Sequence, residues 1–322
     1  MATPEDFVPV ALVSRNGLDE SVHFGAVVML GSDGSITGAS GNPEAIIYPR
    51  SANKPMQAVA MVRAGLQLPP DLLALVCASH DGTPQHTSGV SRILAGAGLG
   101  ADALANTAGL PLDQEAANKV VRGGGSPTAL LMNCSGKHSG MLATCVHRGW
   151  SHARVSGGYL AVDHPLQLAI TEVVDELSGE RHAHIGVDGC GAPAHAMTLA
   201  GLARSFRAIA TGAAGTAGDA VYAAMTGHPQ LVGGELRAVT QFMCGVPGLL
   251  AKDGADGVFA AALPDGRALA LKIADGGERA RPAVMVAALR AMGVEVDAVR
   301  DQVQVRIMGH GDVVGTVRAI EL

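Results

Sequence analysis

The sequence predicts an α+β fold, in which a largely antiparallel sheet is flanked by helices and stands beside a helical subdomain. Segments rich in β-branched residues and separated by glycine-containing turns lie at both ends of the 322-residue chain. Between them, residues 71 to about 242 show alanine-rich helical segments broken by glycine. Pairing the strands of both ends in one sheet buries their apolar faces.

The same pattern defines how the chain is organised. No internal repeat is found, and no linker is long enough to separate independent domains. We therefore expect residues 1–322 to form a single unit, with the sheet part from residues 1–65 and 245–322. Residues 66–244 form the helix-rich part, and a site is expected in the cleft between the two parts.

Composition excludes several classes of protein. Apolar residues make up 48% of the chain and charged residues 16%, which is typical of a globular protein. The net charge of -6 arises from scattered charges without a basic stripe, so nucleic acid is not an expected partner. No apolar run approaches the roughly 20 residues of a membrane span, and residues 1–19 lack the basic start of a secretory signal. Five dispersed cysteines favour a reducing, cytoplasmic location.

The N-terminal elements are predicted in this order. Residues 8–14 and 22–30 are β-rich and are separated by an Asn-Gly turn, which predicts a hairpin. A third short strand is expected around Ile46, before Pro49. Residues 51–65 carry apolar side chains at helical spacing and end in glycine, which predicts a helix that packs on the strands.

The remaining elements follow from the same signals. Six helices are expected in the middle of the chain, at residues 71–79, 87–97, 114–121, 139–148, 164–177 and 194–205. Glycine-rich loops are expected at residues 123–125 and 212–218. After residue 245 one helix is expected at 278–292, and strands at 248–251, 257–263, 268–274, 303–308 and 313–321.

The first candidate for chemistry is the pair Ser51 and Lys54. If Ser51 opens a helix, Lys54 lies about one turn later on the same face, so its amine can approach the serine oxygen. A desolvated lysine has a lowered pKa and can take the serine proton, which makes the serine a nucleophile for amides or esters. The helix start also favours a developing oxyanion. Alternatively, Ser51 is only a helix cap and Lys54 is solvated.

Two further segments hold polar side chains where an apolar run ends. Ser79 precedes His80 at such a point, and it is equally well explained as a second catalytic hydroxyl or as a turn former. Lys252 begins a Lys-Asp-Gly tripeptide at the edge of a predicted strand. It can supply a second cation opposite Ser51, or it can be a solvated hairpin lysine.

Residues 133–140 form the densest run of functional side chains. The run is not a P-loop, because Leu131 occupies a required glycine position and His138 follows Lys137. Nor is it a Gly-x-Ser-x-Gly elbow, because the two glycine positions around Ser135 are occupied by other residues. A tight polar turn before a helix remains, with side chains available to a ligand or metal.

A zinc site is one of two interpretations of the cysteines near these polar runs. Cys134 and Cys190 can bind one zinc, with Lys137, His138 or Asp188 completing the shell. Against this, no Cys-x-x-Cys or His-x-x-x-His pair is present, and two cysteines far apart in sequence are also explained as buried small hydrophobic residues.

Taken together, these clusters resemble a known family. Residues 51–58 (Ser-Ala-Asn-Lys-Pro-Met-Gln-Ala), 77–80, 133–138 (Asn-Cys-Ser-Gly-Lys-His) and 188–193 occur in the order found in the thermolabile or Rhizobium-type L-asparaginases, the asparaginase II family. The resemblance runs from about Val8 to the C-terminus. It implies a fold like that of serine β-lactamases, penicillin-binding proteins and glutaminases. Those relatives carry a Lys-Ser/Thr-Gly strand, which the Lys-Asp-Gly tripeptide resembles apart from its aspartate.

The resemblance implies hydrolysis of L-asparagine to L-aspartate and ammonia through an acyl-enzyme. Ser51 is then the nucleophile and Lys54 its base, and Ser79 with Lys252 forms a second Ser-Lys pair. Alternatives are a glutaminase or another serine amidase on the same scaffold, or a non-catalytic, zinc-bearing descendant.

The resemblance also implies ligands and partners. Cys134, Lys137 and Cys190 are expected to bind about one zinc per chain, which organises the pocket around Asp188 and need not be required for turnover. The expected substrate-binding residues are Arg50, from its charge and position, together with His80, Asn133 and Asp188. A homodimer is expected as well.

Overall fold

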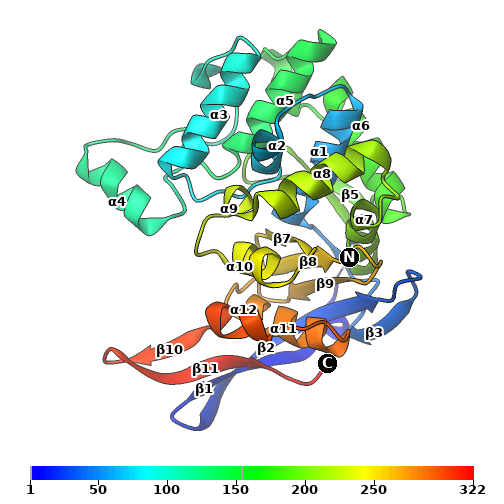
Figure 1. The fold of residues 1–322 in the computed structure, drawn as a ribbon, viewed down its shortest axis with the longest axis vertical. Helices are drawn as coiled ribbons and strands as arrows, with labels where there is room; N and C mark the ends of the chain where they lie inside the picture. Colours follow the sequence, from blue (N-terminus) through cyan, green and yellow to red (C-terminus); the bar gives the residue numbers. More distant parts are fainter. Residues whose placement is uncertain (1, 154) are drawn as a thin grey trace.

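The fold is described from a computed structural model, which covers residues 2–153 and 155–322 (Figure 1). Strands from both ends of the chain form one eight-stranded sheet in the order β10-β11-β1-β2-β9-β8-β7, and β3 pairs with β2. Every pairing is antiparallel, as predicted. The strands are β1 Val8–Arg15, β2 Leu18–Leu30, β3 Ile36–Ser40, β7 Leu250–Gly254, β8 Val258–Ala262, β9 Ala268–Ile273, β10 Arg306–Gly309 and β11 Asp312–Ala319.

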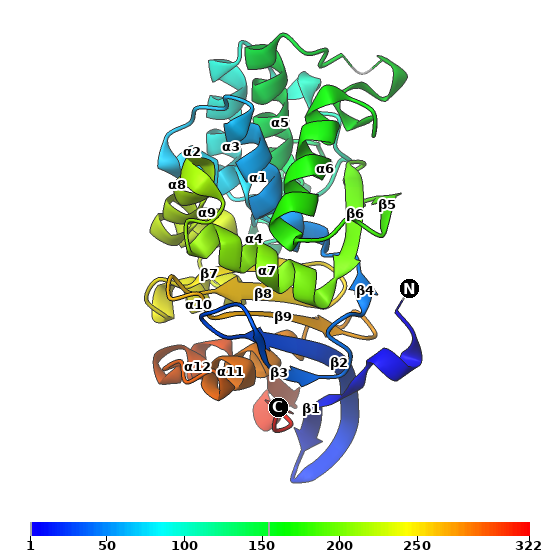
Figure 2. The same cartoon turned by 90° about the vertical axis from the view of Figure 1, so that its right-hand side faces the viewer.

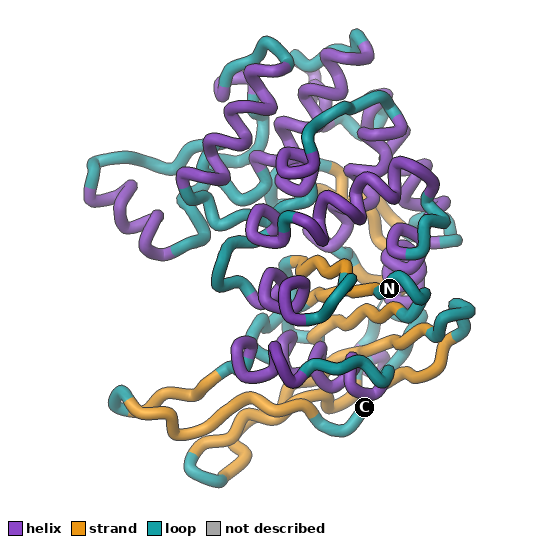
Figure 3. Tube along the Cα trace, viewed as in Figure 1, coloured by secondary structure: helices purple, strands orange, loops and turns teal. Residues whose placement is uncertain are grey.

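The helices gather mainly on one side of this sheet (Figure 3). In chain order they are α1 Lys54–Arg63, α2 Pro70–Val76, α3 Pro84–Gly96, α4 Gln114–Arg122, α5 Ser135–Arg148, α6 Pro165–Ser178, α7 Leu199–Ala210, α8 Gly215–Gly227, α9 Pro229–Val232, α10 Ala238–Gly245, α11 Arg281–Ala291 and α12 Asp297–Val303. Short 3-10 turns are η1 Pro4–Asp6, η2 Arg50–Asn53, η3 Ala101–Ala103 and η4 Val155–Leu160. Helix α7 covers one face of the sheet, and α11 and α12 cover the opposite face (Figure 2).

A second, three-stranded sheet corrects two of the predictions. The strand expected around Ile46 is β4 Ile46–Ile47, but it pairs with β6 Pro193–Thr198, which pairs in turn with β5 His184–Val187. The helix predicted at 194–205 is therefore wrong in its first half, because these pairings hold the alanine-containing segment extended. Only α7 follows as a helix.

Two further predictions need correction. The loop predicted at 212–218 already contains the start of α8. The helix predicted at 139–148 begins four residues earlier as α5, so Lys137 and His138 lie on a helix and not in a turn. Strands β3 and β5 and helices α8, α9, α10 and α12 were not predicted.

Two glycines allow the close packing on which the site depends. A Cβ at Gly254 would lie 2.3 Å from the Pro49 carbonyl oxygen, so only glycine lets β7 approach η2 this closely. A Cβ at Gly136 would lie 2.2 Å from the Leu75 carbonyl oxygen, so α5 packs directly on α2. These contacts bring segments near residues 51, 79, 137 and 252 to one region.

One contiguous apolar core joins the sheet part to the helix-rich part. It includes Ala52 and Met56 beside the site, Leu75 from α2, Phe206 from α7 and Ala260 from β8. Within residues 2–153 and 155–322, no helix combines the length and the apolar character needed to span a membrane.

Candidate active site

Ser51 and Lys54 lie where the short turn η2 runs into α1. Ser51 is half-buried within η2, and Lys54 is the first residue of α1 with only 2% of its surface exposed. Arg50, just before Ser51, has a left-handed backbone with φ of 54°, which is uncommon for a residue other than glycine. The chain thus turns sharply immediately before the predicted nucleophile.

The Lys54 side chain contacts a second serine. Its Nζ donates to Ser79 Oγ at 3.1 Å and to the Ala78 carbonyl oxygen. Ser79 follows α2 and is 6% exposed. Lys54 therefore joins α1 to the end of α2, and the buried serine–lysine contact of this site is Ser79–Lys54.

Lys252 projects from the edge strand β7 and is completely buried. Its Nζ donates to the carbonyl oxygen and the carboxylate of Asp253, not to Ser79. Burial, together with the charges of Lys54 and Arg237, lowers the pKa of Lys252 to about 8 against the opposing effect of Asp253. The expected second pair, Ser79 with Lys252, is therefore replaced by a Lys252–Asp253 pair.

Asp253 is held between cations. Arg237 Nη2 donates to its Oδ2 at 2.9 Å. Burial alone would raise the pKa of this carboxyl, but the charges of Lys252, Arg237 and Arg281 outweigh burial and hold the pKa well below its usual range. The aspartate that distinguishes this tripeptide from Lys-Ser/Thr-Gly thus neutralises part of a strongly cationic region.

His80 and Asn133 were expected to bind substrate, and the structure engages both elsewhere. His80 Nδ1 accepts from the Gly82 backbone at 3.1 Å, and Nε2 lies 2.9 Å from Ser135 Oγ. Burial lowers the pKa of His80 well below its usual value, so the ring is neutral. Asn133 Oδ1 accepts from the Cys134 thiol at 3.1 Å. Neither side chain lines the cavity beside Ser51.

Arg50 and Asp188 meet at the mouth of the site. Arg50 Nε donates to Asp188 Oδ1 at 2.8 Å, and the guanidinium also pairs with Asp256 in the β7–β8 turn. Burial would raise the pKa of Asp188, but the charges of Lys137 and Arg50 lower it. Arg50 thus joins three segments that are distant in sequence.

The expected metal ligands come together beneath Asp188. Cys134, Lys137 and Cys190 are each at most 3% exposed, and Lys137 Nζ lies 3.0 Å from Cys190 Sγ. A hydrogen bond with Cys190 lowers the pKa of the Cys134 thiol, and Cys190 Sγ lies 3.6 Å from Asp188 Oδ2. Burial would lower the pKa of Lys137, but its interactions with the Cys190 and Cys134 sulfurs outweigh burial and raise it.

These residues fit a zinc site of an unusual kind. Over the described part of the chain, no group of three or more His, Cys, Asp and Glu side chains is placed to hold a metal ion. A metal held by Cys134 and Cys190 would therefore need Lys137 as its third protein ligand. Two cysteine thiolates are soft donors that suit zinc, whereas a lysine amine is an uncommon zinc ligand and would have to be neutral.

Three residues of the site were missed by sequence reasoning. Asn53, Gln57 and His195 line a small cavity together with Ser51 and Lys54. Asn53 and Gln57 are four apart, so they share a helix face, and both belong to the quoted segment 51–58. That spacing was the available signal for the two amides. His195 lies on β6 and carried no signal, because its segment was predicted to be a helix.

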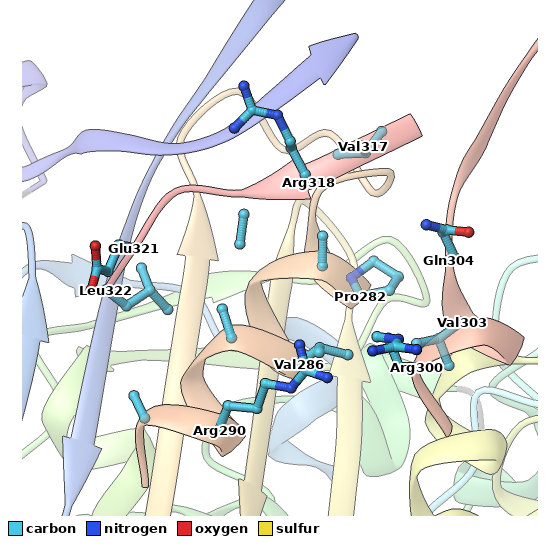
Figure 4. Close-up of a pocket in the computed structure, with 14 residues that line it drawn as sticks. Pro282, Val286, Arg290, Arg300, Val303, Gln304, Val317, Arg318, Glu321 and Leu322 are labelled. Atoms are coloured by element: carbon cyan, nitrogen blue, oxygen red, sulfur yellow. The ribbon is translucent and has the colours of Figure 1, made fainter. Parts of the chain in front are cut away.

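A roomier cavity lies on the other side of the sheet (Figure 4). It has a volume of about 620 Å³ between α11, α12 and β11. Its arginines Arg290, Arg300 and Arg318 pair with carboxylates of Asp297, Asp301 and Asp19. None of the expected site residues lines this cavity, so we place the chemistry at the cavity beside Ser51.

The arrangement beside Ser51 suits a nucleophilic reaction on a small polar substrate. A serine at a sharp turn lies three residues before a buried lysine. That lysine donates to a second serine, and a second lysine has a pKa of about 8. Such groups supply a nucleophile and a proton carrier without any need for a metal-activated water.

Several solved structures are distantly similar to this chain. Mglu in its native form is 16% identical with a TM-score of 0.44, over 84% of this chain and 63% of Mglu. A beta-lactamase from Mycobacterium bovis is 17% identical with a TM-score of 0.39, over 83% and 94% of the two chains. A Bacillus glutaminase is 12% identical with a TM-score of 0.42, over 84% and 89%. The chain thus spans less than two thirds of the length of Mglu, and TM-scores of this size do not establish a common fold.

The sequence comparison is more decisive. Among curated proteins, no sequence matches this chain. The family model described as L-asparaginase II matches residues 11–319, which is nearly the whole chain and includes every residue of the site described above. The chain therefore belongs to the L-asparaginase II family.

Proposed function

We propose that this protein is an L-asparaginase that hydrolyses L-asparagine to L-aspartate and ammonia through an acyl-enzyme. The observation that carries the proposal is the serine–lysine cluster of Ser51, Lys54 and Ser79 in a chain that the L-asparaginase II family model matches. Arg50 and Asp188 complement the α-carboxylate and α-ammonium groups of an amino acid.

In the proposed first step, Ser51 Oγ attacks the side-chain carbonyl carbon of the substrate while Lys54 accepts the serine proton. The carbon–nitrogen bond then breaks, and ammonia leaves with a proton returned by Lys54. Ser79 holds the Lys54 amine in place through its 3.1 Å contact. Water next attacks the ester carbonyl, aspartate is released, and Ser51 regains its proton.

The contact between Lys54 and Ser79 favours a second candidate for the nucleophile. Lys54 donates to Ser79, whereas Ser51 instead lines the cavity. In this alternative Ser79 attacks, and Ser51 positions the amide. A glutaminase or another serine amidase would use the same groups on a longer substrate.

The test is ammonia release from L-asparagine, L-glutamine and D-asparagine, measured for the wild type, Ser51→Ala and Ser79→Ala. We expect release from L-asparagine that is abolished in Ser51→Ala. Mass spectrometry after rapid quenching identifies the acylated serine, and an acyl group on Ser79 would assign the nucleophile to Ser79 instead. No release from any substrate by the wild type would overturn the proposal.

We also propose one zinc per chain, bound by Cys134, Lys137 and Cys190. When bound, zinc would supply positive charge that fixes the loop of Asp188 next to the substrate. Elemental analysis of the purified protein is expected to give about one zinc per chain, and Cys190→Ser is expected to lose it. A metal-free wild type would contradict this assignment. We further propose that the protein is a cytoplasmic homodimer.

A further inference from the structure

The cavity beside Ser51 is very small. Its volume is about 10 Å³, which is close to the least space that holds one water molecule. Asn53, Gln57 and His195 contribute to its lining with Ser51 and Lys54. The cavity therefore has room for a single group of the size of water, ammonia or a primary amide nitrogen.

The walls of this cavity carry polar atoms that lack partners. Asn53, Gln57 and His195 are only 3%, 4% and 1% exposed. Yet, among the residues that the structure describes, nothing hydrogen-bonds to Asn53 Oδ1, Asn53 Nδ2, Gln57 Oε1 or His195 Nδ1. Buried polar groups are nearly always paired, because leaving them unpaired is costly. Several such atoms around one cavity indicate a ligand.

The hydrogen-bonding character of these atoms can be assigned. The Thr171 hydroxyl donates to the Gln167 carbonyl oxygen at 2.9 Å, so it accepts the 2.7 Å hydrogen bond from His195 Nε2. His195 Nδ1 is therefore an acceptor. Burial lowers the pKa of His195 to about 4, so the ring stays neutral at pH 7. With the Asn53 and Gln57 carbonyl oxygens, the unpaired atoms of these three residues are three acceptors and one donor. The other polar residues that line the cavity are Arg50, Ser51, Lys54, Lys137 and Asp188.

We infer that this cavity is the subsite for the leaving nitrogen of a primary carboxamide, and that Asn53, Gln57 and His195 determine specificity for –CONH₂ over N-substituted amides. The inference rests on the proposed function, since it assumes that an amide bond is cleaved beside Ser51. An –NH₂ group donates two hydrogens to the acceptors of the cavity, whereas an N-alkyl group is too large to enter the cavity. The carboxylate of the product has no hydrogens to donate to these acceptors, so the product is released.

The same subsite serves both half-reactions. The carbon–nitrogen bond breaks, the nitrogen takes a proton from Lys54, and it leaves as ammonia. A water molecule of similar size then occupies the place, with its hydrogens directed at the same acceptors. Its oxygen forms the new bond to the acyl carbon, the ester bond to Ser51 breaks, and the serine regains a proton. Atoms and protons balance over the cycle.

The experiment compares L-asparagine with the β-methyl ester of L-aspartate, whose methoxy leaving group is too large for the cavity and brings no N–H to its acceptors. Gln57→Met keeps the side-chain length but removes the acceptor. We expect kcat/KM for L-asparagine to fall about tenfold, as for the loss of one hydrogen bond, with little change for the ester. Gln167→Met is the control, because Gln167 is also buried with an unpaired Oε1 but does not line the cavity. Its amide-to-ester ratio should stay at the wild-type value.

A second measurement needs no variant. Wild-type protein should hydrolyse N4-methyl-L-asparagine about 10- to 200-fold more slowly than L-asparagine, the range for one unaccommodated methyl group. Equal rates on the two amides, or an unchanged amide-to-ester ratio in Gln57→Met, would overturn the inference. Either result leaves the proposed function standing, because L-asparagine is still hydrolysed. Absence of all amide hydrolysis would instead overturn the proposed function.

Discussion

Lys252 shares its buried surroundings with other charges, and this decides its protonation. Lys54 and Arg237 act on it as cations, while Asp253 is the adjacent anion. A lysine with a pKa of about 8 exchanges its proton near neutral pH, as a proton carrier requires. The aspartate in the Lys-Asp-Gly tripeptide therefore keeps this pKa from falling further.

Asp253→Asn is expected to shift the pH dependence of the reaction. If neutral Lys252 is the form that accepts a proton, wild-type kcat rises with pH through about 8. Removing the carboxylate removes the charge that raises the pKa of Lys252, so the rise should move to lower pH. Asp265→Asn, in the β8–β9 turn beside Arg267, is the matched control. A rise that stays in place or moves to higher pH would contradict this role.

His195 makes the fold sensitive to acid. Its pKa is lowered from 6.5 to about 4 by burial, so the unfolded chain binds more protons than the folded one between these values. The contribution of neutral His195 to the free energy of unfolding is therefore fully present above about pH 6.5, and it is lost as pH falls through about 4. The full loss is on the order of 3 kcal/mol.

The measurement is urea unfolding of the wild type and His195→Gln at pH 7 and at pH 4.5. Glutamine stays neutral and can still donate to Thr171. We expect the free energy of unfolding to fall less between the two pH values in His195→Gln than in the wild type. Equal losses in both proteins would show that His195 does not titrate in this range.

At the residue scale, the sequence identified the individual site residues better than the contacts between them. Ser51, Lys54, Ser79 and Lys252 do gather in one region. Helical spacing, however, predicted contacts only within one element, so Lys54 was paired with Ser51. Its observed partner Ser79 comes from the end of another helix. A local sequence pattern cannot predict that α1 packs against α2.

At the element scale, the site depends on how closely β7 approaches η2. The turn carries Ser51 and the strand carries Lys252, and the Gly254 backbone lies directly against Pro49. The Gly254 carbonyl oxygen also accepts a hydrogen bond from Arg281 on α11. The position of the serine is therefore fixed by backbone contact with the sheet.

Gly254→Ala should separate the two elements. The added methyl group would lie 2.3 Å from the Pro49 carbonyl oxygen, so η2 must move. We expect kcat to fall on the order of 100-fold, as for a displacement of about 1 Å in an active site. The free energy of unfolding should fall by about 1–3 kcal/mol. Steady-state kinetics and urea unfolding measure the two effects.

Gly227→Ala provides the control for this substitution. Gly227 ends α8, and a Cβ there meets nothing within 4 Å. Alanine at this position should leave kcat unchanged and raise stability by up to about 1 kcal/mol, because it favours the helix. Wild-type kcat in Gly254→Ala would show that the close approach does not position Ser51.

Element prediction succeeded where local signals and tertiary pairing agreed. The hairpin of β1 and β2 was predicted from alternating β-branched residues around an Asn-Gly turn, and it is present. Residues 194–198 were predicted as the first part of a helix, but they belong to β6, and β4 and β5 pair with this strand on both sides. Helix α8 was missed because glycines at its start resemble a loop. Tertiary contacts override such weak propensities.

At the scale of the whole molecule, one part of the sheet has no covering helix among the residues that the structure describes. Val22 and Phe24 share a face of β2 and are 47% and 49% exposed. Leu12 on β1 lies directly opposite Val22. Farther along the same face of β2, the side chains are buried and α7 packs on the strand. The exposed apolar part thus begins where α7 ends, and large patches of this kind are typical of interaction sites.

We expect the exposed apolar part of β2 to become buried in the interface of the proposed homodimer. Sedimentation of the wild type should give twice the 32.5 kDa mass of the chain. The double substitution Val22→Ser and Phe24→Ser should shift the protein toward the monomer, because two apolar side chains no longer leave water on association. Leu168→Ser is the control, since Leu168 is 55% exposed on α6, away from this sheet. A monomeric wild type would contradict the dimer, and a dimer that survives the double substitution would place the interface on another surface.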